Sequence, residues 1–421
     1  MKRVLRISLL FHILITSQLA AFNMIDEVTI PDQKEKFTFA VPYGFYSETT
    51  ELAFGASWIA SGFGQPQQKL LLNGFAGTNG SLAFFAYGQD TRVPFFERLY
   101  VDTRMILGDY KDVNSYRPGN PDFPGDDAGS NDSDIDDYLE SDGTDYYLRY
   151  NFRYLLPIGH GKNVIHTYQT EGGLLIPESA AGAVSWNPFE SGRVFLENEF
   201  FFRSQDFDDE LGNNFESTTS GINWAIIYDN RDYYANPTRG SRTAIEVSRD
   251  FGIGDSDSTW TAVRFDYTKY LSLGESEEAR QRVIALNFWT SDVPTWDSGN
   301  RPPVFAGSTL GGWERMRAYP EARYNDRSAI YYGAEYRYTP RWNPFTDMWL
   351  VEKLYIPWWQ WVAFAEVGRV ADDYDLGELH EDMQWNAGAG VRMNVLGVTV
   401  RADFAAAEDT FGVQMTVGQP W

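Results

Sequence analysis

The chain has 421 residues, and its 59 acidic and 35 basic side chains give a formal charge of −24, which excludes nucleic acid as a natural partner. Aromatic residues make up 16% of it, too many for a disordered protein, and no apolar run of 18 residues follows the N-terminus, which excludes helical membrane spans. The absence of cysteine excludes disulfides and thiolate metal sites.

The first residues, 1–21, predict a signal peptide. A basic start precedes an almost wholly apolar stretch at 7–16, and small residues suited to cleavage follow. An uncleaved anchor is the alternative, but this stretch is short for a bilayer core of about 30 Å. We therefore expect an exported chain with a short periplasmic segment at 22–48 and a second domain at 49–421.

The second domain alternates apolar and polar residues with a period of two. In 145–156 the even positions carry Tyr, Leu and Phe, whereas the odd positions include Asp, Arg and Asn. The pattern recurs at 263–272, 330–338 and 398–404. A soluble sandwich also alternates, but lipid-facing barrels combine alternation with belts of Tyr and Trp.

About sixteen such segments are predicted, and 163–175 is counted among them. An even number of antiparallel strands can close without leaving an unpaired edge in hydrocarbon. The predicted fold is therefore all-β, a transmembrane antiparallel β-barrel of about 16 strands. The side of the membrane on which the Asp-rich connection 109–141 lies stays open. Strand alternation from a periplasmic N-terminus places it on the periplasmic side, whereas its length indicates the outer side.

This Asp-rich connection is expected to be solvated and mobile, because its charges repel one another. Asp132, Asp134 and Asp136 begin like a calcium loop, but Asp137 and Gly143 stand where that loop needs glycine and glutamate. We predict no metal site, with loose cation association and ordered calcium binding as alternatives.

A turn is predicted where Tyr-Asp-Asn-Arg-Asp and Asn-Pro-Thr-Arg-Gly follow one another in 228–240. Asn-Pro and Gly set the backbone angles of a turn, and Asp and Arg can tie it to itself. The candidate turn residues are Asp229, Arg231, Asp232, Pro237 and Gly240.

A long loop at 292–328 carries the candidate motif Arg315, Met316, Arg317, Ala318 and Tyr319. In 361–368 the odd positions are apolar and are expected to face lipid. The even positions Phe364, Glu366 and Gly368 are therefore expected to face inward. Other candidate inward-facing residues are Glu335, Arg337, Arg392, Arg401 and Asp403. A guanidinium and a carboxylate that are shielded inside a barrel would form a strong, directional pair. The alternative is a pair separated by water and worth at most about 1 kcal/mol.

The last predicted strand, 410–419, is amphipathic. Phe411, Val413, Met415, Val417 and Trp421 share one parity. Gln419 and Pro420 interrupt the apolar pattern, which leaves the register of the final positions open.

Together these motifs resemble those of the bacterial surface antigen family, which includes the BamA and TamA assembly barrels. The 228–240 stretch resembles the family's periplasmic turn. The loop motif resembles Val-Arg-Gly-Phe/Tyr, with Met316 and Ala318 replacing Val and Gly, and 364–368 resembles the Phe-x-Asp-x-Gly motif of the thirteenth strand, with Glu for Asp. The resemblance is strongest over 215–421.

The resemblance implies a lumenal loop whose Arg317 is locked to Glu366, and a C-terminal strand that serves as an assembly signal. It further implies insertion, assembly or translocation of protein or lipid at the bacterial outer membrane, with a diffusion pore or a structural surface antigen as alternatives. Too few residues precede the first strand for the family's POTRA domains. The expected partners are therefore outer-membrane lipids and a periplasmic or assembly-machinery protein, and the oligomeric state stays open.

Catalysis and cofactors are not expected. After the signal segment the only histidines are His160, His166 and His380, none beside an obvious nucleophile, and no Gly-x-Ser-x-Gly elbow is present.

Overall fold

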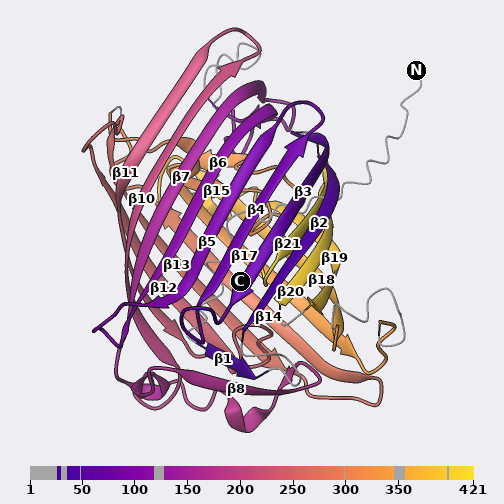
Figure 1. Cartoon of the computed structure of the whole chain (residues 1–421). Helices are drawn as coiled ribbons and strands as arrows, with labels where there is room; N and C mark the ends of the chain where they lie inside the picture. Colours follow the sequence, from indigo (N-terminus) through magenta and orange to yellow (C-terminus); the bar gives the residue numbers. More distant parts are fainter. Residues whose placement is uncertain are drawn as a thin grey trace.

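The computed structural model describes residues 26–29, 36–47, 49–117, 128–297, 299–345, 356–395 and 398–421, so the predicted signal peptide lies outside the described residues. Sixteen strands form one antiparallel sheet that curves into a barrel (Figure 1). In hydrogen-bonded order they are β2 (Phe37–Ser47), β3 (Glu51–Ser61), β4 (Lys69–Gly77), β5 (Leu82–Arg92), β6 (Leu99–Ser115), β7 (Leu139–Leu155), β10 (Arg193–Asp209), β11 (Asn214–Asp229), β12 (Gly240–Phe251), β13 (Thr259–Ser272), β14 (Ala279–Asp292), β17 (Ser328–Pro340), β18 (Trp359–Ala371), β19 (Gln384–Val395), β20 (Val398–Ala406) and β21 (Phe411–Val417).

The remaining elements are short. β1 (Asp26–Thr29) pairs in parallel with β8 (His166–Glu171), which also pairs with β9 (Leu174–Leu175), and β15 (Ser308–Leu310) pairs with β16 (Tyr324–Asp326). The 3-10 helices are η2 (Gly159–Lys162), η3 (Pro177–Ser179), η4 (Val304–Ala306) and η6 (Glu378–His380). No helix in the described ranges is long and apolar enough to cross a bilayer.

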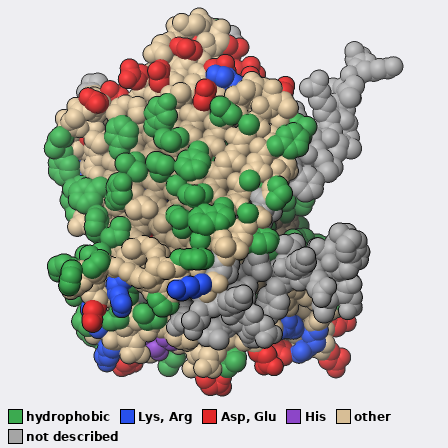
Figure 2. Space-filling model, in the orientation of Figure 1, with side chains coloured by type: hydrophobic (Ala, Val, Ile, Leu, Met, Phe, Trp, Pro, Cys, Tyr) green, Lys and Arg blue, Asp and Glu red, His purple; other side chains and the backbone are tan. Residues whose placement is uncertain are grey.

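The two faces of the sheet differ as the alternation predicts. On β7, Tyr146, Tyr150 and Tyr154 are 41–45% exposed on the outer surface, whereas Asp145 and Arg153 are buried inside. Figure 2 shows hydrophobic side chains over the middle of the visible face and charged side chains toward both ends. The all-β barrel with an apolar outer wall is therefore confirmed.

Two strand predictions are wrong, although the total of sixteen is retained. The barrel begins at Phe37 in β2, inside the predicted periplasmic segment 22–48, and not at residue 49. β2 contains Pro42, which suits an end strand because proline cannot donate to a second ladder. The segment 163–175 forms β8 and β9, which lie outside the sixteen-stranded sheet.

Strand alternation shows at which end of the barrel the Asp-rich connection lies. Because each strand reverses direction, the connection between β6 and β7 leaves the barrel at the end opposite to β8. Residues 128–138 of this connection cover the loop between β14 and β17, where Arg323 Nη1 donates to Ser133 Oγ at 2.8 Å. Asp137 is 2% exposed, so this part is packed and not simply solvated.

The connection 157–192, which we call the strap, crosses the other end of the barrel (Figure 1). Near its start, the carbonyl of Val164 accepts a hydrogen bond from Tyr100 on β6 at 2.9 Å. Farther along, the carbonyl of Gly173 accepts one from Trp358, beside β18, at 2.8 Å. β6 is fifth and β18 thirteenth in the sixteen-strand order, so the strap joins opposite walls. Its middle is fixed by Tyr168, whose ring centroid lies 4.9 Å from that of Tyr233.

Candidate functional site in the barrel lumen

The loop 293–327, which we call the lumenal loop, folds into the barrel, as predicted for 292–328. β15 and β16 form a small hairpin in it, and its tip lies between them in the sequence. Gly311 and Gly312 have φ of 114° and 93°, which glycine adopts without strain. Met316 has φ of 58° and is fully buried. Ala318 is 2% exposed in the same cluster, so these two substitutions in the motif fit the tip.

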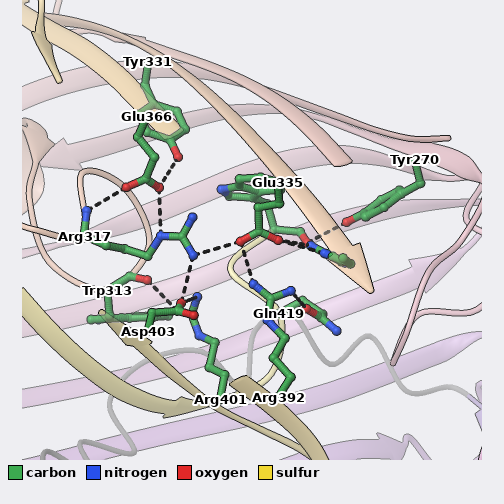
Figure 3. Close-up of polar contacts among 12 residues, drawn as sticks. Tyr270, Trp313, Arg317, Tyr331, Glu335, Glu366, Arg392, Arg401, Asp403 and Gln419 are labelled. Atoms are coloured by element: carbon green, nitrogen blue, oxygen red, sulfur yellow. Dashed lines mark hydrogen bonds and ion pairs between the residues drawn. The ribbon is translucent and has the colours of Figure 1, made fainter. Parts of the chain in front are cut away.

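Arg317 is bound by three carboxylates (Figure 3). Its backbone N–H and Nε donate to the two oxygens of Glu366 at 2.8 and 3.0 Å. Its Nη1 donates to Glu335 Oε1 and to Asp403 Oδ2, each at 2.9 Å. Its guanidinium carbon lies 3.5 Å from the ring centroid of Phe364. Arg317 and Glu366 are therefore in direct contact.

Three more arginines complete this buried network. Arg337 Nη2 and Arg392 Nη2 lie 2.8 and 2.6 Å from the two oxygens of Glu335. Arg401 Nη1 lies 3.0 Å from Asp403 Oδ2. Four guanidinium groups thus surround three carboxylates, and all seven side chains are shielded from solvent. Charges so enclosed are tolerable only when paired, so each member depends on the others.

The second arginine of the motif points to a different wall. Arg315 Nη2 donates to Asp266 of β13 at 2.9 Å, and its guanidinium lies 4.4 Å from the ring centroid of Trp289 on β14. Tyr319 is buried against Tyr324, with ring centroids 5.1 Å apart. The loop tip is therefore held on both sides.

Gly368 leaves room for the loop base. A Cβ there would lie 2.9 Å from Leu310 Cδ1 and 3.5 Å from Met316 Sδ. Its predicted inward direction agrees with this contact, and β18 is the thirteenth barrel strand, where the family motif would stand.

The predicted turn residues lie between β11 and β12, at the strap end. Arg231 donates from Nε and Nη2 to the two carboxylate oxygens of Asp229, at 2.9 and 2.7 Å. Asp232 accepts the backbone N–H of Thr238 at 2.9 Å, and burial raises the pKa of Asp232 above its ordinary value. Gly240 has φ of 93°, and a Cβ there would lie 1.9 Å from the carbonyl oxygen of Asn230. Pro237 belongs to the same closed turn.

The predicted C-terminal residues do not share one face. Phe411 is 61% exposed on the outer surface, and Val413 and Met415 are partly exposed. The side chain of Val417 is outside the described part of the structure. After Gly418, with φ of 96°, residues 418–421 turn inward, and we call them the tail. Trp421 is 7% exposed beside Tyr270, so it does not share the outward face of Phe411, because the strand ends before it.

Several contacting residues were missed by the sequence reasoning. Tyr331 Oη donates to Glu366 Oε1 at 2.6 Å, and its inward parity with Glu335 could have identified it. Gln419 accepts a hydrogen bond from Arg392, and Arg401 donates to the carbonyl of Trp313 at 2.5 Å. No local pattern predicts these contacts, because they join the tail or the loop backbone to distant strands.

A cavity of about 400 Å³ lies beside the lumenal loop. Its lining combines aromatic, acidic and basic side chains, including Trp260, Arg264, Asp266, Trp313 and Glu321. Within the described ranges no group of acidic or histidine side chains could hold a metal ion. The carboxylates of Asp134 and Asp137 instead accept backbone N–H groups of their own turn.

Solved structures share this barrel fold. CdiB from Escherichia coli aligns with a TM-score of 0.56 and 10% identity over 91% of this chain and 62% of that one. CdiB from Acinetobacter baumannii gives 0.50 and 11%, over 90% and 58%. BamA from Haemophilus ducreyi lacking POTRA domains 1-3 gives 0.49 and 12%, over 91% and 69%. The chain thus spans about three fifths of the length of either CdiB, and at these identities the CdiB matches show the fold alone.

A family model decides what the fold alone cannot. No curated protein matches the chain. The Omp85 superfamily domain matches residues 138–421, which is more than half of the chain and includes the lumenal loop, β18 and the last strand. The chain is thus an integral β-barrel of the outer membrane, and it belongs to the Omp85 superfamily.

Proposed function

We propose that this protein assists the insertion or assembly of polypeptides at the outer membrane, in the manner of the BamA and TamA barrels. At the family level it is an insertion or translocation barrel and not an enzyme. The finer proposal is that a seam between β2 and β21, the two end strands of the sheet order, opens toward lipid. Figure 1 draws both strands on the same side of the molecule.

The observation that carries the proposal is the buried network around Arg317. It joins the lumenal loop to β17, β18 and β20, which include the strand next to β21. The sheet order ends at β2 and β21, so a barrel that opens between these strands must keep its shape through contacts elsewhere in its wall. Arginine–carboxylate pairs have fixed hydrogen-bond directions, so a network of them can hold the wall in that shape.

Both ends of the barrel are covered, which favours insertion of clients at the barrel wall over their passage through the lumen. The lumenal loop and residues 128–138 cover one end, and the strap crosses the other. An open diffusion pore would instead need a continuous polar channel.

A reconstitution experiment tests this function. Proteoliposomes containing the purified barrel receive a urea-unfolded outer-membrane barrel as client, and client folding is followed by heat-modifiable gel mobility. We expect faster client folding than in empty liposomes. Liposomes that carry an unrelated, passive barrel control for bilayer defects.

Equal client folding with this barrel and with the passive barrel would refute the proposal. A steady, large conductance of the purified protein in planar bilayers, together with that result, would favour the diffusion pore.

The proposed partner is a separate periplasmic protein that delivers clients to the strap end. Homologues in the superfamily work with partner proteins, and the described N-terminal residues serve as β1, under the barrel, and β2, in its wall. Crosslinking in cells followed by purification of the barrel tests this, and recovery of lipids alone would contradict it.

A further inference from the structure

The tip of the lumenal loop touches the last strand as well as β18. Gly412 of β21 faces the tip, and a Cβ at this position would lie 2.4 Å from the carbonyl oxygen of Arg317 and 2.9 Å from Cα of Ala318. Gln414, on the same face, donates from Nε2 to that carbonyl oxygen at 3.4 Å. The side chain of Arg317 therefore holds β18 while its backbone rests on β21.

The neighbouring strand extends this seat. Ala405 of β20 lies directly opposite Gly412, and it is buried in the same cluster as Ala318. Asp403, opposite Gln414, accepts the hydrogen bond from Arg317. Two small residues thus form a flat surface for the loop backbone, and two polar residues beside them fix its position.

The tail connects the C-terminal end of β21 to the buried network around Arg317. Gln419 accepts a hydrogen bond from Arg392, which also donates to Glu335 at 2.6 Å. The carbonyl of Trp421 accepts a hydrogen bond from Tyr270 at 2.6 Å, across the lumen on β13. β21 is therefore held from the lumen in two places: by the loop at Gly412 and Gln414, and by the tail beyond its C-terminal end.

The first strand is held differently. Phe45 of β2 packs on Phe75 of β4, with ring centroids 5.1 Å apart, in a cluster that includes Phe85 of β5. The two sides of the proposed seam thus belong to separate packing units, one with the loop and one with the early strands.

We infer that Gly412 positions the lumenal loop on the last strand, so that the loop must leave this seat before β21 can move away from β2. This inference rests on the proposed function, because it assigns the loop the control of the seam. The contacts at 2.4 and 2.9 Å involve backbone atoms, which cannot rotate away, so even a methyl group at residue 412 displaces the loop or the strand.

Spin labels across the seam test the inference. Ala40→Cys on β2 and Val413→Cys on β21 are outward-facing, and the chain has no other cysteine. In the purified barrel we expect a single, narrow distance distribution, which Gly412→Val shifts to longer distances. Gln414→Ala, which removes the hydrogen bond without adding bulk, should give a smaller shift in the same direction.

Gly74→Val is the matched control. Gly74 is also a strand glycine, but its nearest contacts to an added Cβ are 3.5 and 3.8 Å, so the label distances should not change. Heat-modifiable mobility reports whether each variant is folded. Should Gly412→Val not fold, Gly412→Ala and Gln414→Ala carry the test.

The outcomes separate this inference from the proposed function. Unchanged distances in the folded Gly412 and Gln414 variants would overturn the coupling, even if the parent protein accelerates client folding. Distances that shift in these variants, in a protein without effect on clients, would support the coupling and refute the function.

Discussion

Arg317 shows how one residue can organise a barrel wall. It is fully buried, and its donors reach carboxylates on β17, β18 and β20. Lysine could not replace it, because a single ammonium group cannot reach three acceptors in one plane. The stacking on Phe364 further restricts its rotamer.

Replacing Arg317 with glutamine should strongly destabilise the barrel. The change leaves Glu366, Glu335 and Asp403 with less positive charge in a shielded site, and breaking a buried network in this way costs about 3–5 kcal/mol. The midpoint of urea unfolding, followed by tryptophan fluorescence, measures the effect. Arg341→Gln is the control, because its contact with Glu275 is exposed and worth at most about 1 kcal/mol. Equal midpoints for the two variants would contradict the assigned role.

Exchanging the two charges should not restore stability. In the double variant Arg317→Glu, Glu366→Arg, the new glutamate faces Glu335 and Asp403, and the backbone N–H of residue 317 loses its acceptor. The urea midpoint should therefore stay near that of Arg317→Glu alone. A return to the parent value would mean that Arg317 and Glu366 act as an isolated pair.

At the scale of single elements, alternation predicts the two faces of a strand but not where the strand lies. The segment 163–175 alternates as barrel strands do, and Tyr168 is buried while Thr167 and Gln169 are exposed. Its inner face packs on Tyr233, however, below the barrel and not in its wall. β2 was missed for the opposite reason, because Pro42 and Gly44 weaken its strand pattern.

The site was more predictable than the ends of the chain. Glu366, Glu335, Arg337 and Asp403 follow from parity on regular strands, because a side chain on the polar face of a barrel strand must point inward. The inward turn of Trp421 depends on Gly418 and on a distant tyrosine, which a local pattern cannot report.

The strap should loosen as the pH falls. His160 Nδ1 accepts the N–H of Gly192 at 3.2 Å, and burial, with smaller contributions from His166 and Arg193, lowers the pKa of His160. The unfolded segment, with a pKa near 6.5, therefore binds a proton that the folded strap excludes. Stability present above about pH 6.5 is lost as the pH falls toward the lower folded pKa.

Hydrogen exchange of the Gly192 amide, corrected for its intrinsic rate, measures this effect at about pH 7.5 and about pH 5.5. We expect faster exchange at the lower pH. His160→Asn keeps an acceptor near the Nδ1 position without a titratable group, so it should remove the difference. His380→Asn, at the other end of the barrel, should retain it. A pH response that persists in His160→Asn would assign the effect to another group.

At the scale of the whole molecule, the lumenal loop and the strap are barriers in series along one lumen. Resistances in series add, so removing one barrier leaves the current limited by the other. A variant in which a short glycine and asparagine turn replaces 159–190 should therefore still show small, flickering conductance in planar bilayers, as should Arg317→Ala alone. The two changes together should give a steady, large conductance. If replacement of the strap alone gave that conductance, the lumenal loop would not seal the barrel, and a pore would become the better account of this chain.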